Sequence, residues 1–229
     1  MKIDRYGQAK ILTPEEIQLL FTQGLDKTRD RALFGICLYT ACRIREACTL
    51  RTADVYNRKG LPRNELIIRK ENTKGKLSTR TLPVIEELRS LLIDYYPQPR
   101  TWFLFTGRHG KGHIHPDSAA RILKAACDKL DLEGISTHSF RRTALTQMSN
   151  AGIPLRVIQE ISGHRSLSVL QGYLEVTPEQ VRGAASSLSM LGYSGHNAPH
   201  HLNPLDWKMD WKNEAEDSKQ HMDWEEERE

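Results

Sequence analysis

The chain has 229 residues, of which 38% are hydrophobic and 27% charged, and its formal net charge is +4. These proportions are typical of a globular protein, and the chain has no apolar run of the 18–20 residues that a membrane-spanning helix needs. The first ten residues contain no apolar segment, so we expect no secretory signal peptide.

The first fifty residues predict three helices. Thr13-Pro14-Glu15-Glu16 is a typical helix start, because threonine caps the helix, proline suits its first position and Glu16 reaches back to the cap. Apolar spacing predicts a second helix over about residues 28–39 and a short third helix over about residues 43–51.

The middle of the chain predicts a small antiparallel hairpin. Residues 66–68 and 79–84 are short strand-like segments, and the connection between them, residues 70–78, is basic. A further short buried strand is expected over residues 102–105. Helical patterns cover about residues 84–95, 116–130, 139–150, 154–161 and 178–188. The fold class is therefore expected to be mixed and mainly α, with a small antiparallel sheet.

The composition changes near residue 192. Residues 206–229 hold ten acidic and four basic residues and carry −6, so residues 1–205 carry (33 − 4) − (29 − 10) = +10. We expect residues 1–191 to form the folded domain and residues 192–229 to be a disordered acidic extension that contains Trp207, Trp211 and Trp224. A basic body favours a polyanionic partner, most often nucleic acid. A binding role for the tryptophans, which would make the chain an adaptor, is the competing interpretation.

The cysteines indicate a reducing compartment. They form no Cys-x-x-Cys pair, which argues against a zinc ribbon or a thioredoxin motif. Three of them lie among aliphatic residues, so we expect buried, reduced thiols and an intracellular protein. The four are Cys37, Cys42, Cys48 and Cys127.

Three short motifs carry candidate chemistry. His138 and Arg141 are three residues apart and share a helix face, so they can converge on one anion. Arg43 lies in an apolar neighbourhood and needs a partner, for which Glu46 is the local candidate. Taken alone, the pair of His138 and Arg141 is more often explained by surface charge, and the pair of Arg43 and Glu46 by a structural ion pair.

The third motif is Gly163-His164, which is followed nine residues later by Tyr173. A helix that ends at residues 162–163 can direct His164 into a cleft. Tyrosine is a poor nucleophile with a pKa of about 10. It becomes useful when neighbouring cations stabilise its phenolate and the negative charge that develops on a phosphate.

The order of these motifs resembles the tyrosine recombinases, also called the phage integrase family. Residues 40–50, TACRIREACTL, resemble the first arginine box of the family, and residues 138–173, HSFRRTALTQMSNAGIPLRVIQEISGHRSLSVLQGY, resemble the second. The similarity covers about residues 12–187. The resemblance implies the family's catalytic fold and cleavage of DNA without metal, ATP or any other cofactor.

The resemblance also implies the role of each residue. Tyr173 would attack the scissile phosphate, forming a 3′-phosphotyrosyl bond and releasing a 5′-hydroxyl. Planar guanidinium groups suit the phosphate oxygens. The implied roles are phosphate binding by Arg43 and Arg141, proton transfer by His138, a phosphate hydrogen bond from His164, and orientation of Arg43 or His138 by Glu46.

The family protonates the leaving oxygen with a lysine on the hairpin. Lys74 is the favoured candidate here, and Lys76 is the alternative because hairpin length varies. Both can equally be simple phosphate contacts. Candidate contacts with the DNA backbone are Lys76, Arg80, Arg142 and Arg165.

No metal site is expected. Residues 107–115, GRHGKGHIH, lack the spacing of a phosphate-binding P-loop. Their three histidines, His109, His113 and His115, have no evident fourth ligand, so a solvated loop is the favoured interpretation. The same holds for His196, His200 and His201.

Two features depart from the family pattern. Ala41 stands where the family usually has glycine. About twelve residues precede the first predicted helix, so the chain resembles a catalytic domain standing alone, as in the short recombinases that invert fimbrial promoter segments. An accessory DNA-binding protein, or cooperative assembly on DNA, would then supply the remaining contacts.

The sequence therefore predicts a site-specific recombinase that integrates, excises or inverts DNA. Its expected partners are double-stranded DNA and further copies of the chain in a tetramer, with no membrane, and its expected location is the cytoplasm at the nucleoid. Two alternatives stay open. One is strand cleavage and religation resembling type IB topoisomerases, and the other is a non-catalytic DNA-binding regulator that keeps the fold.

Overall fold

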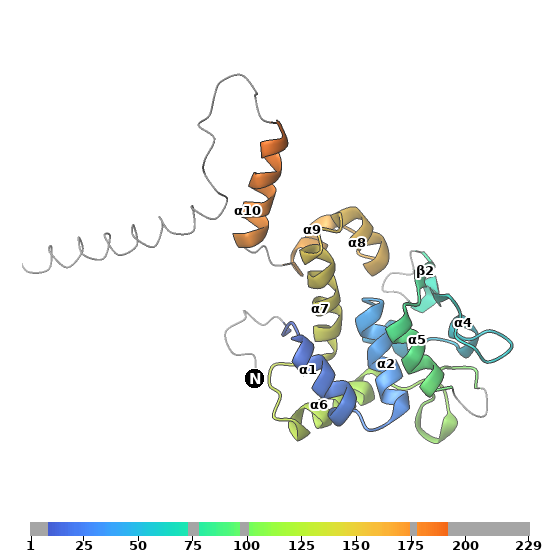
Figure 1. The fold of residues 1–229 in the computed structure, drawn as a ribbon. Coiled ribbons are helices and arrows are strands. Elements are labelled where there is room, and N and C mark those ends of the chain that lie inside the picture. Colours follow the sequence, from blue (N-terminus) through green and yellow to red (C-terminus); the bar gives the residue numbers. More distant parts are fainter. Residues whose placement is uncertain (1–8, 73–77, 97–100, 175–177, 192–229) are drawn as a thin grey trace, which may run out of the picture. The chain divides into compact units, whose positions relative to one another are not determined.

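A computed structural model of the chain describes residues 9–72, 78–96, 101–174 and 178–191 (Figure 1). The chain divides into two units, Met1–Thr177 and Pro178–Glu229. The second unit contains α10 (Pro178–Ser187) and η4 (Leu188–Leu191). The predicted acidic extension, residues 192–229, and both candidate lysines of the hairpin, Lys74 and Lys76, lie outside the described residues.

The first unit begins with the capped helix α1 (Pro14–Leu19), as predicted. The Thr13 hydroxyl accepts a hydrogen bond from the Glu16 N–H at 3.2 Å, and the Glu16 carboxylate accepts one from the Thr13 N–H at 3.1 Å. A π-turn, η1 (Leu20–Gly24), continues the helix. The long helix α2 (Thr28–Tyr39) follows and confirms the second predicted helix.

The predicted helix over residues 43–51 is too long. The chain forms α3 (Ile44–Cys48) and then α4 (Thr52–Val55), with extended backbone at Arg51 between them. Arg51 forms an antiparallel bridge with Phe103, and the Leu50 carbonyl accepts a hydrogen bond from the Leu104 N–H at 2.8 Å. These contacts with a distant segment interrupt the helix.

The predicted hairpin is confirmed. Strand β1 (Glu65–Ile68) pairs antiparallel with β2 (Arg80–Pro83), in a register that sets Ile68 opposite Arg80. The first residues of their connection form the 3₁₀ turn η2 (Lys70–Asn72). The additional strand predicted over residues 102–105 is wrong, because this segment forms only the isolated bridge at Phe103, although Leu104 and Phe105 are buried as expected.

The remaining helices follow the predicted segments closely. A short 3₁₀ turn, η3 (Arg108–Gly110), lies between the first two of them. One helix, α9, was not predicted; it is five residues long and starts after the cap residue Ser166. The helices are α5 (Glu86–Asp94), α6 (Pro116–Lys129), α7 (Thr137–Asn150), α8 (Leu155–Ser162) and α9 (Leu167–Gln171).

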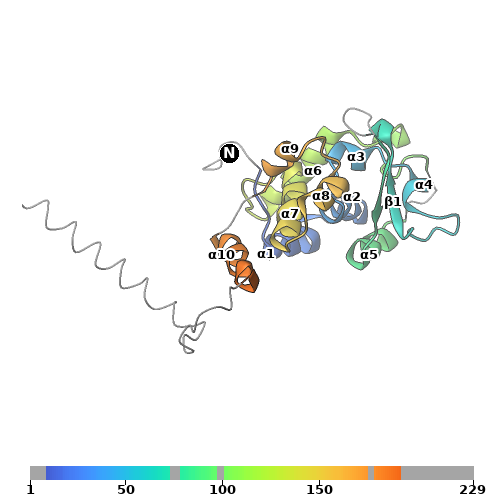
Figure 2. The same cartoon turned by 90° about the horizontal axis from the view of Figure 1, so that it is seen from above.

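Helix α2 is the centre of the first unit and packs against both α5 and α7. Its Phe34 ring stacks on Phe140 of α7 with centroids 5.2 Å apart. Figure 2 shows α2 and α3 between the small sheet with α4 on one side and α7, α8 and α9 on the other. The four cysteines are free and buried, as predicted. Among the described helices, none is both long and apolar enough to span a bilayer.

Candidate active site

The turn between α2 and α3 positions the first arginine. Ala41 in this turn has φ +50°, a backbone conformation that favours glycine. Arg43 is the cap residue of α3, and its N–H donates to the Glu46 carboxylate at 2.8 Å. The Arg43 side chain is 27% exposed and its Nη1 lies 3.4 Å from Glu46 Oε1. The predicted pairing of Arg43 with Glu46 is thus present, through both backbone and side chain.

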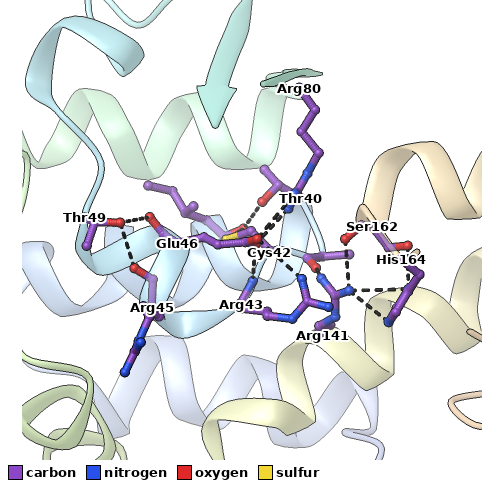
Figure 3. Close-up of polar contacts among 12 residues, drawn as sticks. Thr40, Cys42, Arg43, Arg45, Glu46, Thr49, Arg80, Arg141, Ser162 and His164 are labelled. Carbon is purple, nitrogen blue, oxygen red and sulfur yellow. Dashed lines mark hydrogen bonds and ion pairs between the residues drawn. The ribbon is translucent and has the colours of Figure 1, made fainter. Parts of the chain in front are cut away.

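The second arginine, Arg141, is buried in the first half of α7. Its guanidinium donates one hydrogen bond to the Ala41 carbonyl and one, from Nη2 at 2.9 Å, to the Ser162 carbonyl. Its Nε is buried and has no hydrogen-bond partner among the described residues. Arg141 therefore joins the turn before α3, helix α7 and the end of α8 (Figure 3).

The site carries an excess of positive charge. Burial, together with the neighbouring cation Arg43, lowers the pKa of Arg141 to about 10, so the group stays charged at neutral pH. Arg80 of β2 supplies a third guanidinium and binds Glu46 with Nη2 at 2.8 Å and Nη1 at 3.3 Å. Arg43 and Arg80 contact the buried Glu46 carboxylate, and Arg141 adds a third cation nearby, so the cluster keeps a net positive charge that suits an anion such as phosphate.

His164 lies beside Arg141. It follows Gly163, which ends α8 in the left-handed conformation with φ +65°. The His164 Nδ1 lies 2.7 Å from the Ser162 hydroxyl, and its Nε2 lies 3.0 Å from Arg141 Nη2. Burial, with the charges of Arg141, Arg43 and Arg80, lowers the pKa of His164 to about 3. The imidazole is therefore neutral near pH 7 and accepts from Arg141 at Nε2.

Tyr173 completes this group of side chains. It lies two residues after α9, in the turn formed with Gly172, and is half-buried. Its ring centroid lies 5.0 Å from that of His164 with the planes tilted by 47°. The Thr146 hydroxyl on α7 holds the Tyr173 carbonyl at 3.4 Å. The structure thus brings together four of the six predicted catalytic residues, which are Arg43, Arg141, His164 and Tyr173.

The remaining predicted residues occupy different places. His138 is exposed in the first turn of α7, and Arg165 is exposed directly after His164. Arg142 is 5% exposed and donates to the Ala9 carbonyl at 2.7 Å. Arg80 has a side chain only 11% exposed and contacts Glu46, so the structure gives it a partner within the chain.

The loop histidines do not form a cluster. Among the residues that the structure describes, no three His, Cys, Asp or Glu side chains come together in a way that can hold a metal ion. His113 Nδ1 lies 2.9 Å from the Ile114 carbonyl. His115 caps α6, where its Nδ1 accepts the Asp117 N–H at 3.2 Å. His196, His200 and His201 lie outside the described residues.

Two contacts of the site were not predicted from the sequence. They are the ion pair between Arg80 and Glu46 and the hydrogen bond between Ser162 and His164. The sequence did contain one indication that Arg80 is buried. In β2, Arg80 is two residues before the buried Leu82, so strand alternation places both on the inner face of the sheet. A basic residue on an inner face needs a buried acceptor.

Comparisons with known proteins show which family the chain resembles. The chain is 32% identical over 188 residues to tyrosine recombinase XerA of Pyrococcus furiosus, covering 80% of this chain and 63% of that protein. It is 27% identical over 182 residues to a tyrosine recombinase of Thermosipho africanus, covering 77% of this chain and 61% of the relative. The chain thus spans less than two thirds of the length of these relatives.

Solved structures share the fold. The crystal structure of XerA recombinase matches with a TM-score of 0.63 at 21% identity, covering 82% of this chain and 66% of that chain. The XerH site-specific recombinase bound to palindromic difH substrate matches with a TM-score of 0.59 at 24% identity, over 79% of this chain and 53% of that one. The model of the phage integrase family matches residues 10–180. The chain belongs to the phage integrase family.

Proposed function

We propose that this chain is the catalytic part of a site-specific DNA recombinase that cuts and rejoins strands through Tyr173. The observation that carries the proposal is the convergence of Arg43, Arg141, His164 and Tyr173 from four separate segments of the chain. A phenol beside a neutral imidazole and two guanidinium groups is equipped for attack on a phosphodiester.

In the proposed reaction, the Oη of Tyr173 forms a bond to phosphorus and the bond from phosphorus to the 5′-oxygen breaks. His138 takes part in proton transfer at the phenol, and Lys74 protonates the departing 5′-oxygen. A 5′-hydroxyl from a second strand then attacks the phosphotyrosyl bond and restores Tyr173. Each step exchanges one phosphoester for another, so no ATP is consumed.

The guanidinium groups would stabilise the charge that accumulates on the non-bridging oxygens. Arg43, with a side chain 27% exposed, can approach a phosphate from solvent. Arg141 presents a buried Nε without a partner among the described residues, while both Nη atoms are held by carbonyls. One arginine would therefore adapt to the bound phosphate while the other provides a fixed positive charge.

Double-stranded DNA is the proposed partner. Among the structural neighbours, XerH is bound to a difH substrate in a post-cleavage complex, and the Tn1549 transposon integrase is in complex with a circular intermediate DNA. We further propose that four copies assemble on two duplexes in the cytoplasm at the nucleoid. We also propose that an accessory DNA-binding protein takes part in the assembly.

The test is covalent capture in cells. Tagged protein is isolated under denaturing conditions and the attached DNA is sequenced, for the wild type, for Tyr173→Phe and for the control Tyr39→Phe, which removes a half-buried hydroxyl on α2. We expect DNA on the wild type and on the control, and none on Tyr173→Phe. The recovered sequence then supplies a nicked duplex on which the intermediate is trapped.

The recovered DNA also separates the recombinase from the two alternatives, a topoisomerase-like enzyme and a DNA-binding regulator, because strand exchange can be measured on it. Religation of the original strand without exchange of partners would identify a reaction of the topoisomerase type. Binding of DNA without any adduct would identify a DNA-binding regulator and contradict the proposal.

A further inference from the structure

We propose that Arg80 is a positioning residue of the active site, which ties Glu46 to the turn at Gly163 and so fixes Arg43 relative to His164. The proposal rests on the proposed function for its catalytic consequence. Its structural part, the coupling of three chain segments by one guanidinium, is independent of the reaction.

The first contact of Arg80 is with Glu46. The two Nη atoms bind the two carboxylate oxygens at 2.8 and 3.3 Å, whereas Arg43 Nη1 reaches the same carboxylate at 3.4 Å. The Arg80 and Glu46 side chains are 11% and 1% exposed. A two-pronged ion pair shielded from water is strong and directional. Arg80 is therefore the main side-chain partner of Glu46.

Glu46 in turn fixes the start of α3. Its carboxylate accepts the backbone N–H of Arg43 at 2.8 Å, so the carboxylate position sets the direction in which the Arg43 side chain leaves the helix. Any rotation of Glu46 would thus displace Arg43. Arg80 holds this carboxylate from the opposite side, as Figure 3 shows.

The second contact of Arg80 is with Gly163. A methyl group placed on Gly163 would lie 2.6 Å from Arg80 Nη1 and 3.1 Å from its Cζ. The guanidinium therefore lies directly against the backbone of the left-handed turn that carries His164. Helix α8 and strand β2 are in contact in the fold, in agreement with this arrangement.

The same geometry argues against a direct contact between Arg80 and DNA. Both Nη atoms are engaged by Glu46, and Nε is buried without a partner among the described residues. A phosphate contact would require the guanidinium to leave a buried carboxylate with only the contacts of Arg43, the longer of which is its side-chain ion pair at 3.4 Å, and loss of a buried partner is costly. Arg80 is also the first residue of β2, six positions after Lys74. Its ion pair with Glu46 therefore fixes the point where the connection between β1 and β2 ends.

The chain offers a matched control for this ion pair. Arg69 follows β1 and binds the fully buried Asp54 with Nη2 at 2.7 Å and Nε at 2.9 Å from Oδ1. Arg69→Met thus removes an arginine–carboxylate pair beside the same sheet, and among the described residues this pair includes no member of the active site. Arg80→Met and Arg69→Met together separate loss of stability from loss of positioning.

The first experiment measures adduct formation on the nicked duplex recovered by covalent capture, at saturating protein, together with the dissociation constant at two salt concentrations. We expect Arg80→Met to slow adduct formation about 10- to 100-fold, as for loss of a residue that orients a catalytic group, with binding within about threefold. Arg69→Met should retain the wild-type rate within about threefold. The rate of adduct formation in Arg80→Lys should lie between those of Arg80→Met and Arg69→Met. This variant replaces Arg80→Met in the comparison if Arg80→Met does not fold.

Two results would overturn the proposal. One is an unchanged rate in Arg80→Met. The other is weaker binding with a salt slope reduced by about one and a normal rate at saturation, which identifies a phosphate contact. A third possibility, wild-type protein that forms no adduct, contradicts the proposed function but leaves Arg80 to be judged by a second measurement.

That second measurement needs no DNA. The pKa of the His164 imidazole is followed by NMR in the wild type and in both variants. Because Arg80 is one of the cations that lower this pKa, Arg80→Met should raise it and Arg69→Met should leave it unchanged. Equal values in the wild type and Arg80→Met would show that Arg80 does not act on this turn.

Discussion

The guanidinium of Arg141 donates a hydrogen bond to the backbone carbonyl of Ala41, one hundred residues earlier in the chain. The orientation of that carbonyl depends on the left-handed backbone at Ala41, where φ is +50°. The turn before α3 and the first turns of α7 are therefore coupled through a single peptide unit.

Exchange of Ala41 tests this turn. Ala41→Gly should change the free energy of unfolding by less than about 1 kcal/mol, because relief of the left-handed strain is offset by the greater entropy of glycine in the unfolded chain. Ala41→Val should cost more than about 2 kcal/mol, since a β-branched residue is strained there and Ala41 is buried. Urea unfolding measures both, and equal stabilities of the two variants would contradict the argument.

Arg141→Lys should slow formation of the phosphotyrosyl adduct about 10² to 10³-fold. Lysine carries a single ammonium group and does not reproduce the planar fork that reaches both carbonyls. A matched control is Arg31→Lys, because Arg31 also donates to two backbone carbonyls, those of Leu25 at 2.9 Å and Asp26 at 3.1 Å. A comparable loss of rate in both variants would point to a general effect on folding.

Glu46→Gln should lower the free energy of unfolding by about 2–4 kcal/mol at pH 7, because it leaves buried positive charge uncompensated. Burial raises the pKa of Glu46, but the hydrogen bond and charge of Arg80, with those of Arg43, outweigh it and hold the pKa below its ordinary value of 4.5. The stabilisation is thus complete above about pH 4.5 and is lost as the pH falls through the lower, folded-state pKa. Chemical unfolding from pH 3 to 7 should show the two proteins converging at acid pH.

His164 should make folding sensitive to acid. Its pKa is about 3 in the folded protein against an ordinary value of 6.5, so below pH 6.5 the unfolded chain binds a proton that the folded one does not. Stability is therefore full above about pH 6.5 and declines towards pH 3, by up to about 1.4 kcal/mol per pH unit for one proton. His164→Gln should show a shallower decline in unfolding experiments between pH 4 and 7. Identical slopes for the two proteins would show that His164 is not buried neutral.

Gly163→Ala should destabilise the protein more than Gly152→Ala. Both glycines have positive φ, +65° and +73°, so alanine is strained by about 1 kcal/mol at either position. At Gly163 the added methyl group meets the Arg80 guanidinium at 2.6 Å, whereas at Gly152 no atom of the described residues lies within 4 Å of it. The difference between their unfolding free energies isolates the contact with Arg80. Equal losses of unfolding free energy in the two variants would mean that the Arg80 side chain moves away from the added methyl group at no cost.

Local signals in the sequence were sufficient to predict most of the helices and both strands of the hairpin. Thr13 with Glu16, the proline at the start of α6 and the glycine after α8 each mark a helix end through interactions within a few residues. The hairpin was predictable for the same reason. The failure over residues 43–51 involves long-range pairing, since the predicted helix is broken by contacts of Leu50 and Arg51 with residues 103–104.

The contacts of the candidate site also fall into those that local spacing predicts and those that depend on long-range packing. The pairing of Arg43 with Glu46 is three residues apart and could be predicted from spacing alone. The second partner of Glu46 lies 34 residues away on β2, and its identity depends on how the sheet packs against α3 and α8. The meeting of Tyr173 with His164 was expected only from the family resemblance, because nothing local fixes the distance between their rings.

Two of the acceptors that hold the Nη atoms of Arg141 are main-chain carbonyls, at Ala41 and Ser162. Side-chain replacement at these positions does not remove a peptide oxygen, so an alanine scan is blind to both bonds. Their contribution is accessible through substitution of the backbone or through Arg141 itself. The placement of this guanidinium therefore depends on the path of the backbone at residues 41 and 162, whereas the side chains there are constrained for other reasons, Ala41 by its buried left-handed turn and Ser162 by its contact with His164.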